Sequence, residues 1–276
     1  MFRIPLGGSM QRDDYTEANR RSWNETAPVH AARKFQGLLE GFRTPGYLTL
    51  DALETERLTA LGLAGKSVAQ LACNNGRELL SIKGLGAGRC VGFDISDEFM
   101  AQGGALAAAG GLDCQFVRVS VYDIPHEYDA GFDLVYISIG ALGWMPDLDA
   151  FFAVAARLLR PGGHLFVYEM HPLLDMFEEI DEGAAAADPL KIHYSYFKDD
   201  PYVDTSGLDY YGGTTYEGQP TYWFHHKLSD ILGGLLHNGI SIEAFDEYPH
   251  DISNVFAHLE PFGLLPLSYI LVGRKG

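Results

Sequence analysis

Short apolar segments alternate with helical segments through the middle of the chain, and this alternation limits its possible folds more than any other feature. The apolar segments have the length of buried strands, and they span residues 67–73, 89–94, 114–119, 132–138 and 163–170. Helical segments follow several of them, at 77–85, 98–109 and 148–159. Because strands joined through helices pair in parallel, the pattern predicts a parallel sheet covered on both faces.

The ends of the chain add further elements to this sheet. Helices are expected before it and a helix and two strands after it, at residues 13–40, 49–61, 223–238, 240–248 and 265–274. About sixteen residues separate the last two strands, and they include Pro261 and Gly263. That is too short for a crossover with a full helix, so this pair is expected to be antiparallel. The predicted fold is α/β, with a seven-stranded, mostly parallel sheet whose last strand is antiparallel.

Composition excludes several classes of function. The net charge of −17 would repel nucleic-acid phosphates and anionic membrane surfaces, so neither is an expected partner. No apolar run reaches the roughly 18 residues of a membrane span, and residues 1–12 lack the apolar centre of a secretory signal. Cys73, Cys90 and Cys114 form no CxxC pair and are expected to be buried thiols. These observations favour a cytoplasmic protein with a small-molecule partner.

The first strand ends in a turn that suits a ligand. Asn74, Asn75 and Gly76 tolerate positive φ angles, so they allow a tight turn with exposed backbone N–H groups. The helix that follows directs its positive end to the same place. An electron-rich group could bind there, although an ordinary strand-to-helix turn explains the residues equally well.

Asp94 ends the second strand, eighteen residues after Gly76. A carboxylate at that place can accept hydrogen bonds from both hydroxyls of a ribose, and we favour this role over capping of the next helix. The position alone does not separate NAD from S-adenosylmethionine. The GxGxxG fingerprint of dinucleotide enzymes is missing, which counts against NAD.

Four motifs, in this order and at these intervals, resemble those of the class I S-adenosylmethionine-dependent methyltransferases. They are the turn 70–76, Asp94, Phe132-Asp133-Leu134-Val135 and Leu158-Leu159-Arg160-Pro161-Gly162-Gly163. The resemblance covers about residues 65–170 well and extends through the closing antiparallel strands. It implies a Rossmann-like fold, S-adenosylmethionine as cofactor and S-adenosylhomocysteine as product.

The first motif departs from the family pattern. The family carries an acidic residue where this chain has Gln70, and glycines where it has Ala72 and Asn74; only Gly76 matches. A glutamine could still hydrogen-bond the methionine amino group, but more weakly because it has no charge. We expect a variant donor loop; the other interpretation is a protein that has lost its donor site.

The resemblance assigns a set of residues to the donor. Those expected to bind the cofactor are Tyr15, Trp23, Gln70, Ala72, Cys73, Asn74, Asn75, Gly76, Asp94, Ile95, Ser120, Val121, Tyr122, Ser138 and Ile139. Within this set, Val121 would offer its backbone N–H to the adenine ring. Tyr15 and Trp23 belong to the N-terminal helix, which often closes the donor pocket in similar methyltransferases.

The acceptor side is expected after the fifth strand. His171 follows this strand directly and is the first choice for a base, with a strand-capping role as the other interpretation. His225 and Tyr194 are further catalytic candidates, and His225 and His226 are expected to open the later helix. Residues expected to contact the acceptor are Trp144, Tyr196, Tyr210, Tyr211, Tyr222 and His226. No spacing such as HExxH supports a metal site.

Residues 171–222 have no regular period and hold seven tyrosines, so we expect them to form a lid over the acceptor, or else a homodimer contact or surface cover. The predicted organisation is an N-terminal helical cap at 1–62 and a core domain at 63–276. The predicted function is methyl transfer to an O, N or C atom of a small molecule. The alternatives are a non-catalytic binding or regulatory protein of this fold and an NAD(P)-dependent oxidoreductase.

Overall fold

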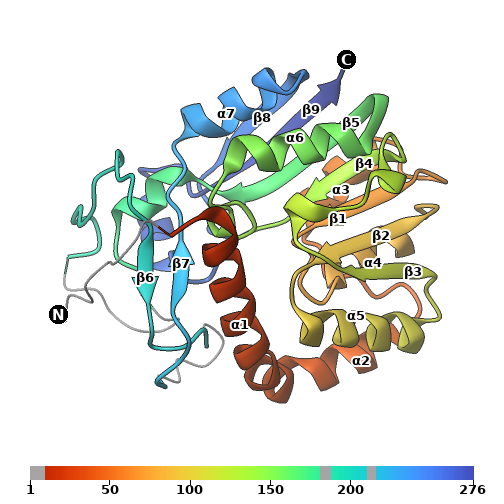
Figure 1. Cartoon of the computed structure of the whole chain (residues 1–276), viewed down its shortest axis with the longest axis horizontal. Helices are drawn as coiled ribbons and strands as arrows, with labels where there is room; N and C mark the ends of the chain where they lie inside the picture. Colours follow the sequence, from red (N-terminus) through yellow and green to blue (C-terminus); the bar gives the residue numbers. More distant parts are fainter. Residues whose placement is uncertain (1–9, 181–187, 210–215) are drawn as a thin grey trace.

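A seven-stranded sheet forms the centre of the computed structural model, which describes residues 10–180, 188–209 and 216–276 (Figure 1). The strand order is β3-β2-β1-β4-β5-β9-β8. The strands are β1 (Val68–Leu71), β2 (Cys90–Asp94), β3 (Cys114–Arg118), β4 (Phe132–Ile137), β5 (Leu159–Met170), β8 (Ile240–Tyr248) and β9 (Ser268–Lys275). Strands β1 to β5 are parallel, and β9 runs antiparallel to both β5 and β8. This confirms the predicted sheet and its antiparallel last strand.

Helices cover both faces of the sheet, as predicted. The helices are α1 (Arg12–His30), α2 (Gln36–Phe42), α3 (Ala52–Ala60), α4 (Arg77–Gly84), α5 (Asp97–Gly110), α6 (Leu148–Leu158) and α7 (Leu228–His237). Side chains of α6 and α7 form one core with the sheet, and those of α3 and α4 form another on the opposite face. A π-helical turn, Ala31–Phe35, continues α1 into α2.

Two of the family-like motifs meet at the edge of the sheet away from the strands' carboxyl ends. Arg160 Nη1 lies 2.8 Å from Asp133 Oδ1, and Asp133 Oδ2 accepts hydrogen bonds from the backbone N–H and hydroxyl of Ser67. These contacts join the starts of β1, β4 and β5. The two motifs therefore hold the sheet together at this edge.

The segment between β5 and α7 contains a small second sheet. Strand β6 (Tyr202–Asp204) pairs antiparallel with β7 (Thr221–Trp223). Trp223 pairs with Tyr202 in this sheet, so the helix predicted from residue 223 begins only at Leu228. The expectation that His225 and His226 open this helix was therefore wrong, because both lie in the link between β7 and α7.

Helix α1 joins this insertion to the main sheet and lies between the β6–β7 pair and α5 (Figure 1). On the insertion side, His30 Nε2 donates a hydrogen bond of 2.6 Å to the carbonyl of Leu208. On the side of the sheet, the hydroxyl of Ser96, which caps α5, donates to Asn24 Oδ1 at 2.7 Å. The helix therefore connects the turn after β2 with a segment more than a hundred residues later. No helix of the described segments is long and apolar enough to cross a membrane.

Candidate functional site

A cavity of about 760 Å³ lies at the carboxyl ends of the central parallel strands. Its walls come from the turns after β1, β2, β3 and β4, from α1, from the insertion and from residues 252–256. Open parallel sheets bind ligands at this edge, and the volume is typical of a small-molecule site.

Several residues of the turn from β1 to α4 have backbone angles that favour glycine. Ala72, Asn74 and Gly76 have φ angles of 49°, 49° and 65°, so all three are left-handed. A Cβ atom on Gly76 would lie 2.2 Å from the ring of Phe116, so a larger residue there would have to displace that ring. Asparagine enters this region more easily than most residues, whereas alanine is strained in it. The backbone is therefore left-handed at both positions where the resemblance expects glycine and this chain has Ala72 and Asn74.

Asp94 fixes this turn and lines the cavity. Its Oδ2 accepts a 2.7 Å hydrogen bond from the backbone N–H of Asn74, and its Oδ1 accepts one of 2.9 Å from that of Ser96. Burial raises the pKa of Asp94 to about 6, although the backbone hydrogen bonds lower it. The group is therefore ionised at neutral pH, and its oxygens can accept a further hydrogen bond from a donor such as a ribose hydroxyl.

Gln70 points away from the cavity. It is fully buried, its Nε2 donates to the hydroxyl of Ser138 at 3.1 Å, and its Oε1 accepts from the backbone N–H of Leu79 at 3.1 Å. These bonds join β1, β4 and α4, so the glutamine is used within the protein. Cys73 and Gly76 likewise shape the turn without lining the cavity.

The other donor-side residues divide between the cavity wall and the layer behind it. Those that line the cavity are Trp23, Ala72, Asn74, Asn75, Asp94, Ile95, Ser120, Val121, Tyr122, Ser138 and Ile139. Tyr15 is not among the lining residues; its ring packs edge-on against Tyr222 and Phe224, with centroid separations of 5.0 and 5.2 Å. Most of the predicted donor residues therefore lie together on the cavity wall, whereas Tyr15 packs against the insertion outside the cavity.

Glu169, near the end of β5, holds the loop after β4 and was not predicted. Its carboxylate accepts hydrogen bonds from the backbone N–H groups of Gly140, Leu142 and Met170, at 2.8, 3.1 and 2.9 Å. Burial raises its pKa to about 7. An acidic residue within an otherwise apolar strand was the signal in the sequence that could have identified it.

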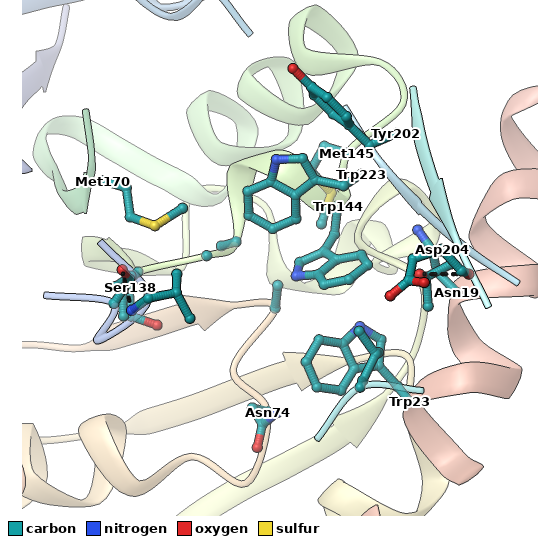
Figure 2. Close-up of a pocket in the computed structure, with 18 of the residues that line it drawn as sticks. Asn19, Trp23, Asn74, Ser138, Trp144, Met145, Met170, Tyr202, Asp204 and Trp223 are labelled. Atoms are coloured by element: carbon teal, nitrogen blue, oxygen red, sulfur yellow. Dashed lines mark hydrogen bonds between the residues drawn. The ribbon is translucent and has the colours of Figure 1, made fainter. Parts of the chain in front are cut away.

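Three indole rings form a row across the cavity, and they are the only tryptophans of the chain. Figure 2 shows them running from Trp223 through Trp144 to Trp23, toward Asn74 of the β1–α4 turn. The ring centroids of Trp144 lie 5.1 Å from Trp223 and 5.0 Å from Trp23, and both pairs are T-shaped. Gly143 permits this packing, because a Cβ there would lie 2.3 Å from the ring of Trp223.

His171 does not line the cavity. Its ring is buried, Nδ1 accepts a hydrogen bond from the backbone N–H of Leu173, and Nε2 lies 3.0 Å from Glu247 Oε1. Burial lowers its pKa, and the charge of Glu247 opposes that effect. The ring caps the 3₁₀ turn Pro172–Met176, which agrees with the strand-capping interpretation of this histidine.

Asp175, which the sequence did not single out, presents a carboxylate to the cavity. Its Oδ1 accepts a hydrogen bond of 3.3 Å from the indole N–H of Trp223. Its Oδ2 lies 2.8 Å from Nδ1 of His225, whose Nε2 donates to the carbonyl of Tyr196 at 2.7 Å. His225 is buried and lies behind Asp175 instead of facing the cavity.

The remaining acceptor-side candidates have different positions. Trp144 and Tyr194 line the cavity. Tyr196, Tyr222 and His226 lie outside the lining; the Tyr196 hydroxyl accepts a hydrogen bond from the backbone N–H of Leu228, and His226 Nε2 donates to the carbonyl of Met145. Tyr210 and Tyr211 lie outside the described residues.

Comparisons with known proteins agree with this geometry. Residues 68–163 match a family described as methyltransferase domain. No curated protein is significantly similar in sequence. Among solved structures, an S-adenosylmethionine-dependent methyltransferase from Mesorhizobium loti is 20% identical, with a TM-score of 0.58; the match covers 80% of this chain and 96% of that one.

Two further structures show that the fold supports different chemistries. A geranyl diphosphate C-methyltransferase from Streptomyces coelicolor, in complex with S-adenosyl-L-homocysteine, is 13% identical, with 95% of this chain and 98% of that one covered and a TM-score of 0.60. The cyclase SpnF is 16% identical, with coverages of 91% and 96% and a TM-score of 0.51. These likenesses concern the fold. The family match places a methyltransferase domain at residues 68–163, and the solved structures show that the chain shares the fold of S-adenosylmethionine-dependent methyltransferases.

Proposed function

We propose that the protein transfers the methyl group of S-adenosylmethionine to an O, N or C atom of a small-molecule acceptor. One observation carries the proposal: residues of the predicted donor site and residues of the insertion line the same cavity of about 760 Å³. Helix α1 and the insertion close over it through contacts such as that of His30 with Leu208. A cavity of this size suits a small acceptor better than a folded protein.

The donor fits the residues on one side of this cavity. The ionised carboxylate of Asp94 would accept hydrogen bonds from the ribose hydroxyls, and Ile95, Val121 and Tyr122 would surround the adenine. The left-handed turn at Ala72 and Asn74 lets the backbone approach the methionine part closely. When bound, the cofactor supplies an activated methyl group on a sulfonium.

The protein would act mainly by alignment and exclusion of water. Trp144 lies between the donor side and the acceptor side, in contact with both Trp23 and Trp223. Holding two reactants in line within a closed site removes much of the entropic barrier to displacement. The hydroxyl of Tyr194, at the cavity wall, would help to orient the acceptor.

For acceptors that must lose a proton, we assign proton acceptance to Asp175, positioned by His225. Asp175 lines the cavity, whereas His171 is separated from it. Once an acceptor is known, Asp175→Asn should lower turnover with little effect on donor binding. His171→Ala should mainly lower thermal stability. Normal turnover in the first variant together with a loss in the second would contradict this assignment.

Calorimetry with S-adenosylhomocysteine tests the proposal. Binding supports a working donor site, and incubation with methyl-labelled S-adenosylmethionine and a mixture of small metabolites should then yield a labelled small product. Binding without any labelled product would favour the non-catalytic alternative or a reaction other than methylation. Failure to bind this ligand, with binding of NADH instead, would favour the oxidoreductase.

A further inference from the structure

We propose that the acceptor is an amine, which binds as its ammonium cation between the indoles of Trp144 and Trp223 and the carboxylate of Asp175. This inference rests on the proposed function and names the chemical class of its acceptor. Three observations support it: the charge on the acceptor side, the arrangement of the indoles, and the hydrogen bonds of Asp175.

The charge on the acceptor side is negative. Carboxylates of Asp175, Glu178 and Asp204 line this part of the cavity. Arg77 is the only lysine or arginine among the described residues that line the cavity. It lies on the donor side, at the start of α4, and pairs with Glu78. An anionic acceptor, such as a diphosphate, would be repelled here, and a neutral one would gain nothing from these charges.

The two indoles provide a complementary apolar surface. Trp144 and Trp223 meet at 90°, so their rings form a corner in the cavity wall (Figure 2). A cation near such ring faces is attracted by their quadrupoles, and most strongly by that of tryptophan. Met145 and Phe177 also line this region, so the organic part of the amine would contact apolar groups.

Asp175 is fixed where it can contact the cation. The indole N–H of Trp223 donates to its Oδ1, which ties the carboxylate to one wall of the corner. The hydrogen bond to His225 holds the other oxygen. The side chain of Asp175 is 15% exposed, so its charge is only weakly screened by solvent and retains much of its attraction for an ammonium group.

The same pair can accept the proton that an ammonium must lose. The Tyr196 carbonyl can only accept a hydrogen bond, so Nε2 of His225 carries a hydrogen, and Nδ1 faces Asp175. The hydrogen bond between Asp175 Oδ2 and His225 Nδ1 already holds one proton, so the proton from the ammonium would be taken up on Oδ1 of Asp175. The amine nitrogen then forms a bond to the methyl carbon while the carbon–sulfur bond breaks and leaves its electron pair on sulfur. The products are a methylated ammonium ion and neutral S-adenosylhomocysteine.

Binding measurements with probes of similar shape and different charge test this inference. The full chain is saturated with S-adenosylhomocysteine and titrated at pH 7.5 with 2-phenylethylamine, 2-phenylethanol and 3-phenylpropanoate. We expect the amine to bind at least tenfold more tightly than the alcohol, and the carboxylate more weakly than either. Equal or tighter binding of the alcohol or the carboxylate, or no binding of the amine, overturns the inference.

Two variants locate the effect. Asp175→Asn should weaken binding of the amine at least fivefold and leave the alcohol unchanged. Asp149→Asn makes the same change of charge on the exposed start of α6 and should leave both unchanged. Equal losses in the two variants would show a general effect of surface charge and overturn the inference.

If the chain binds S-adenosylhomocysteine but shows no preference for the cation, only this inference fails; if it does not bind S-adenosylhomocysteine, the proposed function fails with it.

Discussion

The side-chain amide of Asn19 pairs with the main chain of Tyr222 as a neighbouring strand would. Its Nδ2 donates to the Tyr222 carbonyl at 2.9 Å, and its Oδ1 accepts from the Tyr222 N–H at 2.8 Å. Asn19 is 4% exposed and lines the cavity, so this buried contact fastens α1 to β7 at the edge of the site. The contact links the helix over the donor side to the insertion over the acceptor side.

Asn19→Ala should release β7 from α1. Two hydrogen bonds of ~0.5–1.5 kcal/mol each would be lost, and the Tyr222 amide would no longer be protected by Asn19. We expect hydrogen exchange at this amide to accelerate at least tenfold, together with weaker binding of S-adenosylhomocysteine. Gln36→Ala, at an exposed position of α2, serves as the control. Unchanged exchange at Tyr222 would mean that the strand is held without Asn19.

Donor affinity should depend on the ionisation of Asp94. Its pKa of about 6 means that the carboxylate gains a proton below that pH and loses its charge-assisted hydrogen bonds. Binding of S-adenosylhomocysteine should therefore weaken as the pH falls through about 6. Asp94→Asn should weaken it at least tenfold at pH 7.5, from loss of ~1.5–3 kcal/mol, and flatten the pH dependence. Asp113→Asn, at an exposed position, is the control and should bind like the wild type. If binding to Asp94→Asn depends on pH as steeply as binding to the wild type, Asp94 does not bind the donor as a carboxylate.

Stability should fall as the pH rises, in part because of Glu54. This side chain is buried beside the hydroxyl of Tyr136, and burial raises its pKa from 4.5 to about 8. Between these values the folded state keeps a proton that the unfolded state releases. Its stabilising contribution is therefore complete below pH 4.5 and is lost as the pH rises through 8. Urea denaturation should show that Glu54→Gln loses less stability between pH 5 and 8 than the wild type does. Glu56→Gln, at an exposed position of α3, should lose as much as the wild type. The raised pKa of Glu169 also makes stability fall as the pH rises, so Glu54→Gln should keep part of the pH dependence of stability.

Ala72→Gly should stabilise the protein. A left-handed alanine costs roughly 1–2 kcal/mol, and glycine removes that strain at an entropic cost of roughly 0.5–1 kcal/mol. We expect a net gain of ~0.5–1 kcal/mol in the free energy of unfolding, measured by denaturant titration. The same substitution at Ala60, at the end of α3, should destabilise. A loss of stability at both positions would show that the turn is not strained at Ala72.

The sequence predicted the sheet because local patterns decide it. The apolar segments and the helices between them are short, and parallel pairing follows from their order. Asp94 could be placed in the site for a similar reason, since the end of β2 must lie beside the turn after β1. The shape of that turn was also predictable, because Asn74 and Gly76 both suit left-handed backbone.

The acceptor side was less predictable because contacts between distant segments form it. Position in the chain pointed to His171 after β5, but the following turn directs its ring toward Glu247 on β8. Asp175 is held at the cavity by Trp223 at the end of β7 and by His225 in the link that follows, about fifty residues later. Asn19 and Tyr222 are 203 residues apart, and no periodic pattern in either segment predicts their pairing.

The row of tryptophans gives the protein an optical property. Every indole of the chain lines the one cavity, and neighbouring rings are close enough to exchange excitation energy. Tryptophan emission, excited at wavelengths where tyrosine does not absorb, is therefore a readout of this cavity alone. Filling of the donor side should alter the surroundings of Trp23, and filling of the acceptor side those of Trp223. The unlabelled protein can thus report the order in which its two ligands arrive.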